Sequence, residues 1–239
     1  MATGGRGFNG TNQSGSAGTS AALQLATLSI HMWIRDVTSA GGALLEALAA
    51  GAYQGFRFAL VQGGYTNGLS FYDGAGWNGS ILVDIVAASA GAWYPIGVRA
   101  NGSGTGNAAK FYAGGSPNGT FTPANIPTPA GVTKYLACDV DATHTEGKFS
   151  EIGVWSSVLS DANFADLGAG RSPGAISPST LVSHWRMNES GTSITDLKSG
   201  ITLTLSNAPS TVAGPTVDEP PGGAGILLLE GDQYCGGYR

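Results

Sequence analysis

Apolar and polar residues alternate along much of this chain, which is the pattern of β-strands that bury one face. The clearest case is residues 28–35, where Leu28, Ile30, Met32 and Ile34 share a face. Further strand candidates are residues 56–62, 69–72, 81–86, 94–98, 110–112, 135–140, 149–155, 181–187 and 201–205. Clusters of Gly, Asn, Ser or Pro separate most of them. So many short strands favour an all-β fold with two antiparallel sheets stacked as a sandwich, rather than a small barrel.

Two segments depart from the strand pattern. Residues 160–167 (SDANFADL) predict one short helix, with Ser160 as its N-cap and Asp161 favourable to the helix dipole. Gly168 would take the left-handed position that ends the helix. Residues 43–50 (ALLEALAA) have high helix propensity, but they lie between strand candidates. Their conformation is left open between helix and strand.

The C-terminal part of the chain has a different composition. Residues 208–225 contain four prolines beside paired glycines, which is typical of a linker. We therefore predict a sandwich domain over residues 1–207 and an extended arm over residues 208–239. The arm ends in an apolar run that we expect to serve assembly, by docking on this domain or on a neighbouring subunit: Ile226, Leu227, Leu228 and Leu229.

The composition narrows the classes of partner. Charged residues make up only 11% of the chain, against about 25% in typical soluble domains, and glycine accounts for 39 of 239 residues. The net charge is −5 and no basic stripe is visible, so we expect no nucleic-acid partner. No run of apolar residues is long enough to predict membrane insertion, and residues 1–10 do not resemble a secretion signal.

Several short motifs follow one another between residues 7 and 207. They are GFNGTN at 7–12, LSIHMWI at 28–34, WYPIGV at 93–98, KFYAGG at 110–115, FSEIGVW at 149–155, VLSDA at 158–162 and LVSHWRMNESG at 181–191. Their order resembles the laminin-G-like, concanavalin A-like lectin and glucanase family. The resemblance implies a jelly-roll sandwich. Large aromatic residues dominate such cores, so Trp33, Trp93, Trp155 and Trp185 are expected there, with sugar stacking as the alternative for any one of them.

Catalytic chemistry is not expected. The glucanases of this family carry an E-x-D-x-x-E run that supplies the acid and the nucleophile, and no such run occurs here. Glu146 and Glu151 are five positions apart, and Asp139 and Asp141 have no third carboxylate at the right spacing. The three histidines each stand alone in the sequence, so no zinc site is indicated either. We therefore predict a protein that is not an enzyme.

Two loop regions hold candidate binding residues. Aromatic rings beside amide and carboxylate groups can stack on and hydrogen-bond a sugar, which makes a candidate ligand site of Tyr65, Asn67, Tyr72, Asp73, Trp77 and Asn78. Lectin-like sandwiches often hold calcium at a loop rim, so the resemblance makes calcium the one candidate cofactor, with Asp139, Asp141 and Glu146 as ligands. A hairpin tip that merely packs and a solvated turn are the respective alternatives.

Two functions remain open. The first is a virion structural protein, either a capsid-decoration or a tail or fibre component of a bacteriophage, made in the host cytoplasm and displayed on the virion surface. It would form a homo-oligomer and contact other virion proteins. The expectation rests on low charge, the sandwich pattern, the absence of a signal pattern and the GGAGILLLE segment at 222–230, which resembles the ends of phage structural proteins. The alternative is a free carbohydrate-binding lectin module that recognises a cell-surface glycan, with calcium as its candidate cofactor.

Overall fold

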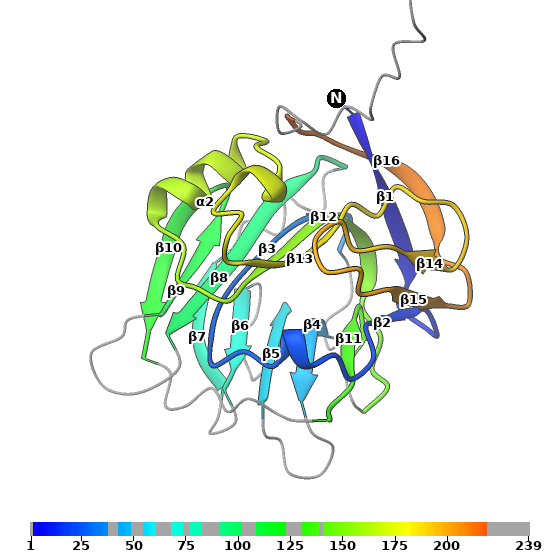
Figure 1. The fold of residues 1–239 in the computed structure, drawn as a ribbon, viewed down its shortest axis with the longest axis horizontal. Helices are drawn as coiled ribbons and strands as arrows, with labels where there is room; N and C mark the ends of the chain where they lie inside the picture. The colour runs from blue at the N-terminus through cyan, green and yellow to red at the C-terminus, as the bar shows by residue number, and fades with distance from the viewer. Residues whose placement is uncertain are drawn as a thin grey trace, which may run out of the picture.

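The computed structural model describes residues 2–37, 43–48, 55–60, 68–73, 77–82, 91–101, 109–122, 131–138 and 141–218, with the backbone alone for residues 2 and 77–82. Two antiparallel sheets face each other across an apolar core, so the predicted jelly-roll sandwich is confirmed (Figure 1). In the part of the chain described here, no helix combines the length and the apolar character needed to cross a membrane.

Sheet A contains both the N-terminal strand and the last described strand. Its order is β10 (Ser116–Phe121), β9 (Ala109–Ala113), β8 (Tyr94–Asn101), β3 (Thr27–Arg35), β12 (Glu146–Trp155), β1 (Ala2–Asn9) and β16 (Ser210–Thr216), and β13 (Leu181–Trp185) also pairs with β12. Sheet B runs β14 (Ser193–Ile194), β15 (Leu203–Ser206), β2 (Ser14–Ser16), β11 (Lys134–Leu136), β4 (Ala43–Leu48), β5 (Gly55–Leu60), β6 (Gly68–Tyr72) and β7 (Trp77–Leu82). Two 3-10 turns are also present, η1 (Ala21–Leu23) and η2 (Pro173–Ala175).

Strand β3 shows why the alternating pattern predicts the fold correctly. Leu28, Ile30, Met32 and Ile34 all lie in the core between the sheets, as their common parity predicts. The residues between them point to the outer face of sheet A, yet these are buried too. A second layer therefore covers this part of the outer face.

Glycines make room for that second layer. His31 of β3 lies in register between Gly97 of β8 and Gly153 of β12. A side chain at Gly97 would collide with the ring of Phe164, and one at Gly153 would collide with the ring of Trp155. The two bare positions thus receive aromatic rings, which form a small apolar cluster with Tyr112, Leu159, Leu167, Ile176 and Leu181.

The helix of this layer is α2 (Asp161–Gly168), close to the predicted range. The Ser160 side chain accepts from the Asn163 backbone N–H, and the Asn163 side chain accepts from the Ser160 N–H, which completes a capping box. The prediction for Gly168 was wrong. Gly168 belongs to the helix, and the left-handed φ of 98° occurs two residues later, at Gly170.

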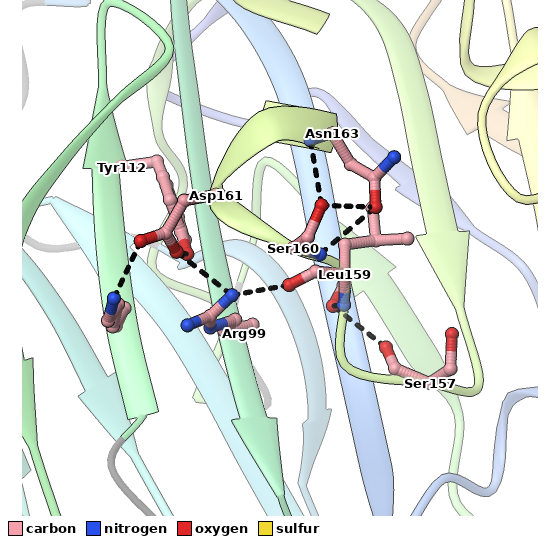
Figure 2. A network of polar contacts seen from close by, with 9 residues as sticks. Arg99, Tyr112, Ser157, Leu159, Ser160, Asp161 and Asn163 are labelled. Carbon is pink, nitrogen blue, oxygen red and sulfur yellow. Dashed lines mark hydrogen bonds and ion pairs between the residues drawn. The ribbon is translucent and has the colours of Figure 1, made fainter. Parts of the chain in front are cut away.

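The carboxylate of Asp161 fixes α2 to sheet A (Figure 2). It accepts from Tyr112 Oη at 2.6 Å and forms ion pairs with Lys110 Nζ at 2.8 Å and Arg99 Nη1 at 3.0 Å. The hydrogen bond from Lys110, followed by that from Tyr112, lowers the pKa of Asp161. Each contact uses a residue on β8 or β9, so the helix covers that side of the sheet, at the upper left of Figure 1.

Residues 43–48 form strand β4 rather than a helix. All six residues are buried, and β4 lies between β11 and β5 inside sheet B. Glu46 pairs across the strands with Arg57 and forms a buried ion pair with its guanidinium. Tertiary pairing thus overrides helix propensity here. Residues 49 and 50 lie outside the described chain.

Sheet A continues beyond residue 207, the boundary drawn from the sequence. Residues 210–216 form β16, which pairs antiparallel with β1 at the edge of the sheet. Pro215 is compatible with this strand because an edge strand leaves one row of backbone groups outside the ladder. Of the predicted arm, residues 219–239 lie outside the described chain, and with them the apolar run 226–229.

Candidate functional site

A pocket of about 460 Å³ opens on the outer face of sheet A, where β1 lies between β12 and β16. Its volume falls within the usual range for small-molecule sites. The second layer that covers β8 and β9 does not supply any of its lining residues. We name it the Gly7 pocket, and it is lined by Gly7, Phe8, Asn9, Gln13, Asp36, Glu146, Gly147, Lys148, Ala208 and Ser210.

Strand β1 presents bare backbone to this face. In the run Thr3–Asn9, the large residues Arg6 and Phe8 point inward, and the glycines at 5 and 7 point outward. A Cβ at Gly7 would lie 2.8 Å from Ser210 Oγ, so the missing side chain leaves the floor of the pocket open. Gly7 is not among the residues with positive φ, so the backbone conformation does not require glycine there.

The glycine at position 5 is covered by an aromatic ring instead. Its Cβ would lie 2.9 Å from Cη2 of Trp93, whose indole N–H donates to the Ala213 carbonyl at 3.0 Å. The Arg35 guanidinium lies over the same ring, 5.0 Å from its centroid. Trp93 is half-buried, whereas Trp33, Trp155 and Trp185 are buried as predicted. This ring therefore covers strand β1 at Gly5, and it does not line the Gly7 pocket.

A charged pair forms one wall of the pocket. Lys148 follows Glu146 on the same face of β12, and its ammonium donates a hydrogen bond to the carboxylate of Asp36, the residue after β3. This hydrogen bond is the largest cause of the lowered pKa of Asp36, and the nearby charges of Lys148 and Arg35 lower the pKa further. Asp36 and Lys148 each keep about a third of their side-chain surface exposed, so a ligand in the pocket can reach both.

Amide side chains shape the opposite rim. Gln13 Oε1 accepts from the Asn9 backbone N–H at 2.9 Å, and Gln13 Nε2 donates to the Asn207 carbonyl at 2.9 Å. Asn9 Oδ1 accepts from the N–H groups of Thr11 and Asn12 at 3.0 and 3.2 Å. These bonds join the turn after β1 to the segment before β16, so the rim is built before any ligand arrives.

The described members of the predicted sugar-binding set lie elsewhere, on or directly after strands of sheet B. Tyr72 is the cross-strand partner of Arg57 on β6 and β5, and Asp73 is fully buried. Trp77 and Asn78 are described by their backbone alone, and Tyr65 and Asn67 lie outside the described residues. Their role in ligand binding stays a prediction.

The predicted calcium ligands do not come together among the described residues. The Asp141 carboxylate lies 3.6 Å from Arg57 Nη2 beside sheet B, whereas Glu146 lines the Gly7 pocket on sheet A. Asp139 lies outside the described residues. Over the described ranges, no three His, Cys, Asp or Glu side chains form a group that could hold a metal ion. Because one of its three ligands is not described, the calcium site stays a prediction.

Glu151, the carboxylate nearest to a glucanase pattern, is enclosed. It occupies a β-bulge in β12 with a left-handed φ of 47°, at the point where the neighbour of β12 changes from β1 to β13. Its side chain is fully buried and bonds to His184 Nε2 at 2.8 Å and Arg186 Nε at 3.3 Å. A carboxylate in this position binds β13 to sheet A and does not face a substrate.

The end of the LVSHWRMNESG motif also has a structural role. The Glu189 carboxylate accepts from the Thr195 backbone N–H, and Asp196 accepts from the N–H groups of His184, Lys198 and Ser199. These carboxylates satisfy backbone donors in the turns around β14. The motif therefore marks how the chain folds rather than where it binds.

Sequence reasoning missed most of the Gly7 pocket. It singled out Glu146, but it did not identify Gly7, Asp36 or Lys148 as members of one site. Asp36 and Lys148 are 112 positions apart, and no local spacing connects them. One sequence signal for the pocket was available. In TGGRGFN, glycines alternate with Arg6 and Phe8, which predicts a strand that carries no side chains on one face.

No protein-family model matches the sequence, and no curated protein matches it. Solved structures do share the fold. One is a protein of Bacteroides ovatus named for an inferred carbohydrate-binding role, with a TM-score of 0.60 and 16% identity over 92% of this chain and 61% of that one. Another is the heptameric SAP-like pentraxin of Limulus polyphemus, with a TM-score of 0.56 and 14% identity over 90% of this chain and 95% of that one. The chain spans about three fifths of the first protein. At these identities the likeness establishes the fold alone, a jelly-roll sandwich.

Proposed function

We propose that this domain is a non-catalytic, lectin-like module that binds a saccharide in the Gly7 pocket. The observation that carries the proposal is the pocket itself. It is a half-open hollow with a glycine floor, surrounded by carboxylate, ammonium, amide and hydroxyl groups on a rigid sheet. The lectin-like fold shared with the two solved structures is consistent with it.

The chemistry of the lining suits a polyhydroxylated ligand. Each carboxylate oxygen accepts hydrogen bonds, and the two oxygens of one carboxylate can accept from neighbouring hydroxyl groups of a sugar ring. Asp36 is held in place by Lys148, so it meets a ligand without a large loss of side-chain entropy. The floor is bare backbone, which lets a ring approach the sheet closely.

A non-catalytic role is supported by the surroundings of the acidic residues. Glu151 is enclosed between β12 and β13, and Asp141 lies beside the Arg57 guanidinium. Retaining and inverting glycosidases need two accessible carboxyl groups on either side of the scissile bond. Glu151 and Asp141 do not offer such a geometry, and of the two carboxylates in the lining of the Gly7 pocket, Asp36 is held in an ion pair with Lys148.

The test is a glycan array probed with the wild-type protein and with Gly7→Ala. The added methyl group fills the pocket floor, and Ser210 Oγ, its nearest neighbour, can rotate away, so the fold should survive. We expect Gly7→Ala to weaken binding by roughly tenfold or more. Thr204→Ala, at an exposed position of β15 in sheet B, is the matched control and should bind as the wild type does.

The array is run with calcium and with a chelator, because calcium is the predicted cofactor. Binding that survives chelation is expected if the Gly7 pocket acts alone. An array that stays blank in both conditions refutes the proposed function. Equal binding by wild type and Gly7→Ala shows that a saccharide binds elsewhere.

The finer assignment, a bacteriophage virion component displayed on the particle, is a second proposal. It is supported by the low charge of the chain and by the apolar run at 226–229. Truncation after residue 218 keeps β16 and removes that run. We expect the shortened protein to lose homo-oligomers seen by size-exclusion chromatography with light scattering. Unchanged assembly, or virions whose mass spectra lack the chain, would count against this assignment.

A further inference from the structure

The bare position at Gly7 lies between two side chains of the neighbouring strands. In register, Gly7 is opposite Lys148 of β12 on one side and Ser210 of β16 on the other. A Cβ at Gly7 would lie 3.5 Å from Lys148 Cγ and 3.8 Å from Val212 Cγ1, which are ordinary contact distances. The space above the glycine therefore has apolar groups beside it, and these suit the C–H groups of a sugar ring.

The ammonium of Lys148 supplies hydrogen-bond donors to this space. A lysine ammonium carries three N–H donors. Among the described residues, Lys148 has one hydrogen-bond partner, the carboxylate of Asp36. About a third of its side-chain surface is exposed. The remaining N–H groups can therefore donate to a ligand that lies above Gly7.

The carboxylate of Asp36 supplies acceptors at the same place. It accepts from Lys148 and from the backbone N–H of Gly91, and Arg35 Nε lies 3.6 Å from Oδ2, beyond hydrogen-bond distance. A carboxylate has about four acceptor sites, so some of them remain available. The hydrogen bond from Lys148 is the largest cause of the lowered pKa of Asp36, which therefore stays ionised at neutral pH.

A free donor and a free acceptor thus lie side by side, because Lys148 and Asp36 are bonded to each other. Two hydroxyl groups on neighbouring carbons of a sugar ring present the complementary arrangement, since each hydroxyl can both donate and accept. Resting on the saccharide-binding function above, we infer that the Gly7 pocket recognises two adjacent hydroxyl groups of one sugar residue, of which one donates to Asp36 and the other accepts from Lys148. Both bonds have a charged partner, which makes each of them stronger than a bond between neutral groups.

Isothermal titration with monodeoxy probes tests this recognition. The parent is the oligosaccharide that gives the strongest array signal, and each probe lacks one of its hydroxyl groups. For the wild type, we expect two probes, whose missing hydroxyl groups belong to neighbouring carbons, to bind roughly tenfold more weakly than the parent. Lys148→Met keeps an apolar stem and removes the ammonium. One of the two losses should disappear in this variant, and the other should persist.

Asp36→Asn is the complementary variant, and asparagine tolerates the left-handed φ of 52° at this position. It should reduce the loss that persists in Lys148→Met. The control is Lys110→Met, the same substitution in another ion pair of sheet A, where Lys110 Nζ lies 2.8 Å from Asp161 Oδ2. This control should keep both losses.

The outcomes separate this recognition from the proposed function. A wild type that does not lose affinity at two adjacent hydroxyl groups overturns the recognition and leaves saccharide binding standing. Losses that neither Lys148→Met nor Asp36→Asn changes do the same. Failure of every oligosaccharide to bind overturns both.

Discussion

The buried His31 makes the stability of this fold sensitive to mild acid. The ring lies on the outer face of β3, beneath the second layer, with 1% of its surface exposed. It meets Trp33 edge-on, with ring centroids 6.2 Å apart. Burial lowers the pKa of His31 from 6.5 to about 3; the Glu151 carbonyl opposes this shift, and the charge of His184 adds to it. The folded protein therefore keeps this imidazole neutral at any pH above about 3.

The sign and size of the effect follow from proton linkage. Between pH 6.5 and about 3, the unfolded chain binds a proton at His31 that the folded chain does not bind. The stabilisation is complete above pH 6.5 and is lost as the pH falls, at about 1.4 kcal/mol per pH unit. At about pH 5 the loss amounts to about 2 kcal/mol. For a domain of this size, that lowers Tm by about 4–8 °C.

The assay compares the wild type with His31→Leu, which fills the same space without a titrating group. Urea unfolding is followed by tryptophan fluorescence between about pH 5 and pH 7. Asp36 and Asp161 have lowered pKa values, so the stability they contribute declines only at more acidic pH. The free energy of unfolding of the wild type should fall more steeply with decreasing pH, by the equivalent of one proton. Parallel pH profiles for the two proteins would refute the reasoning.

Three further predictions concern stability. Arg57→Ala leaves the Glu46 carboxylate buried without its guanidinium and should cost about 3–5 kcal/mol in urea unfolding, and Glu46→Leu combined with Arg57→Met should recover most of this loss. Ser160→Ala removes the hydroxyl that accepts from the Asn163 backbone N–H and should lower stability by about 1 kcal/mol; no change in Tm would argue against the cap. Gly97→Ala places a methyl group against the Phe164 ring and 2.8 Å from the Ile30 carbonyl, and should destabilise by about 1–3 kcal/mol in calorimetry; a wild-type Tm would contradict this close packing.

The fold could be predicted from the sequence because strands of a sandwich bury one face, which makes apolar side chains recur at every second residue. Strand β3 keeps strict parity over its whole length, and its four aliphatic residues all reach the core. Strand β4 shows the limit of such reading. Propensity reports the preference of an isolated segment, whereas Leu45 and Glu46 are fixed by partners on β11 and β5 that no local pattern identifies.

The Gly7 pocket was less accessible to sequence reasoning because its members converge from four separate places. Gly7 comes from β1, Asp36 follows β3, Lys148 lies on β12 and Ser210 begins β16. Only the pairing of these strands brings the side chains together, and pairing is a long-range property. Sequence reasoning selects residues with functional groups, so it predicted sites among the aromatic and acidic residues of two loop regions. Gly7 forms the floor of the pocket but has no functional group by which a binding site could be predicted.

The position of β1 has a consequence for how the protein is made. Its neighbours in sheet A are β12 and β16, and Ser210 bonds to Gly7 across 203 residues of chain. Contacts of such high sequence separation slow folding, because a long loop must close before any of them forms. Until β16 has been synthesised, β1 lacks one of its two neighbours, so ribosome-bound chains expose an unpaired strand edge that can aggregate. The Gly7 pocket is therefore complete only once β16 has paired with β1 and closed this edge of sheet A.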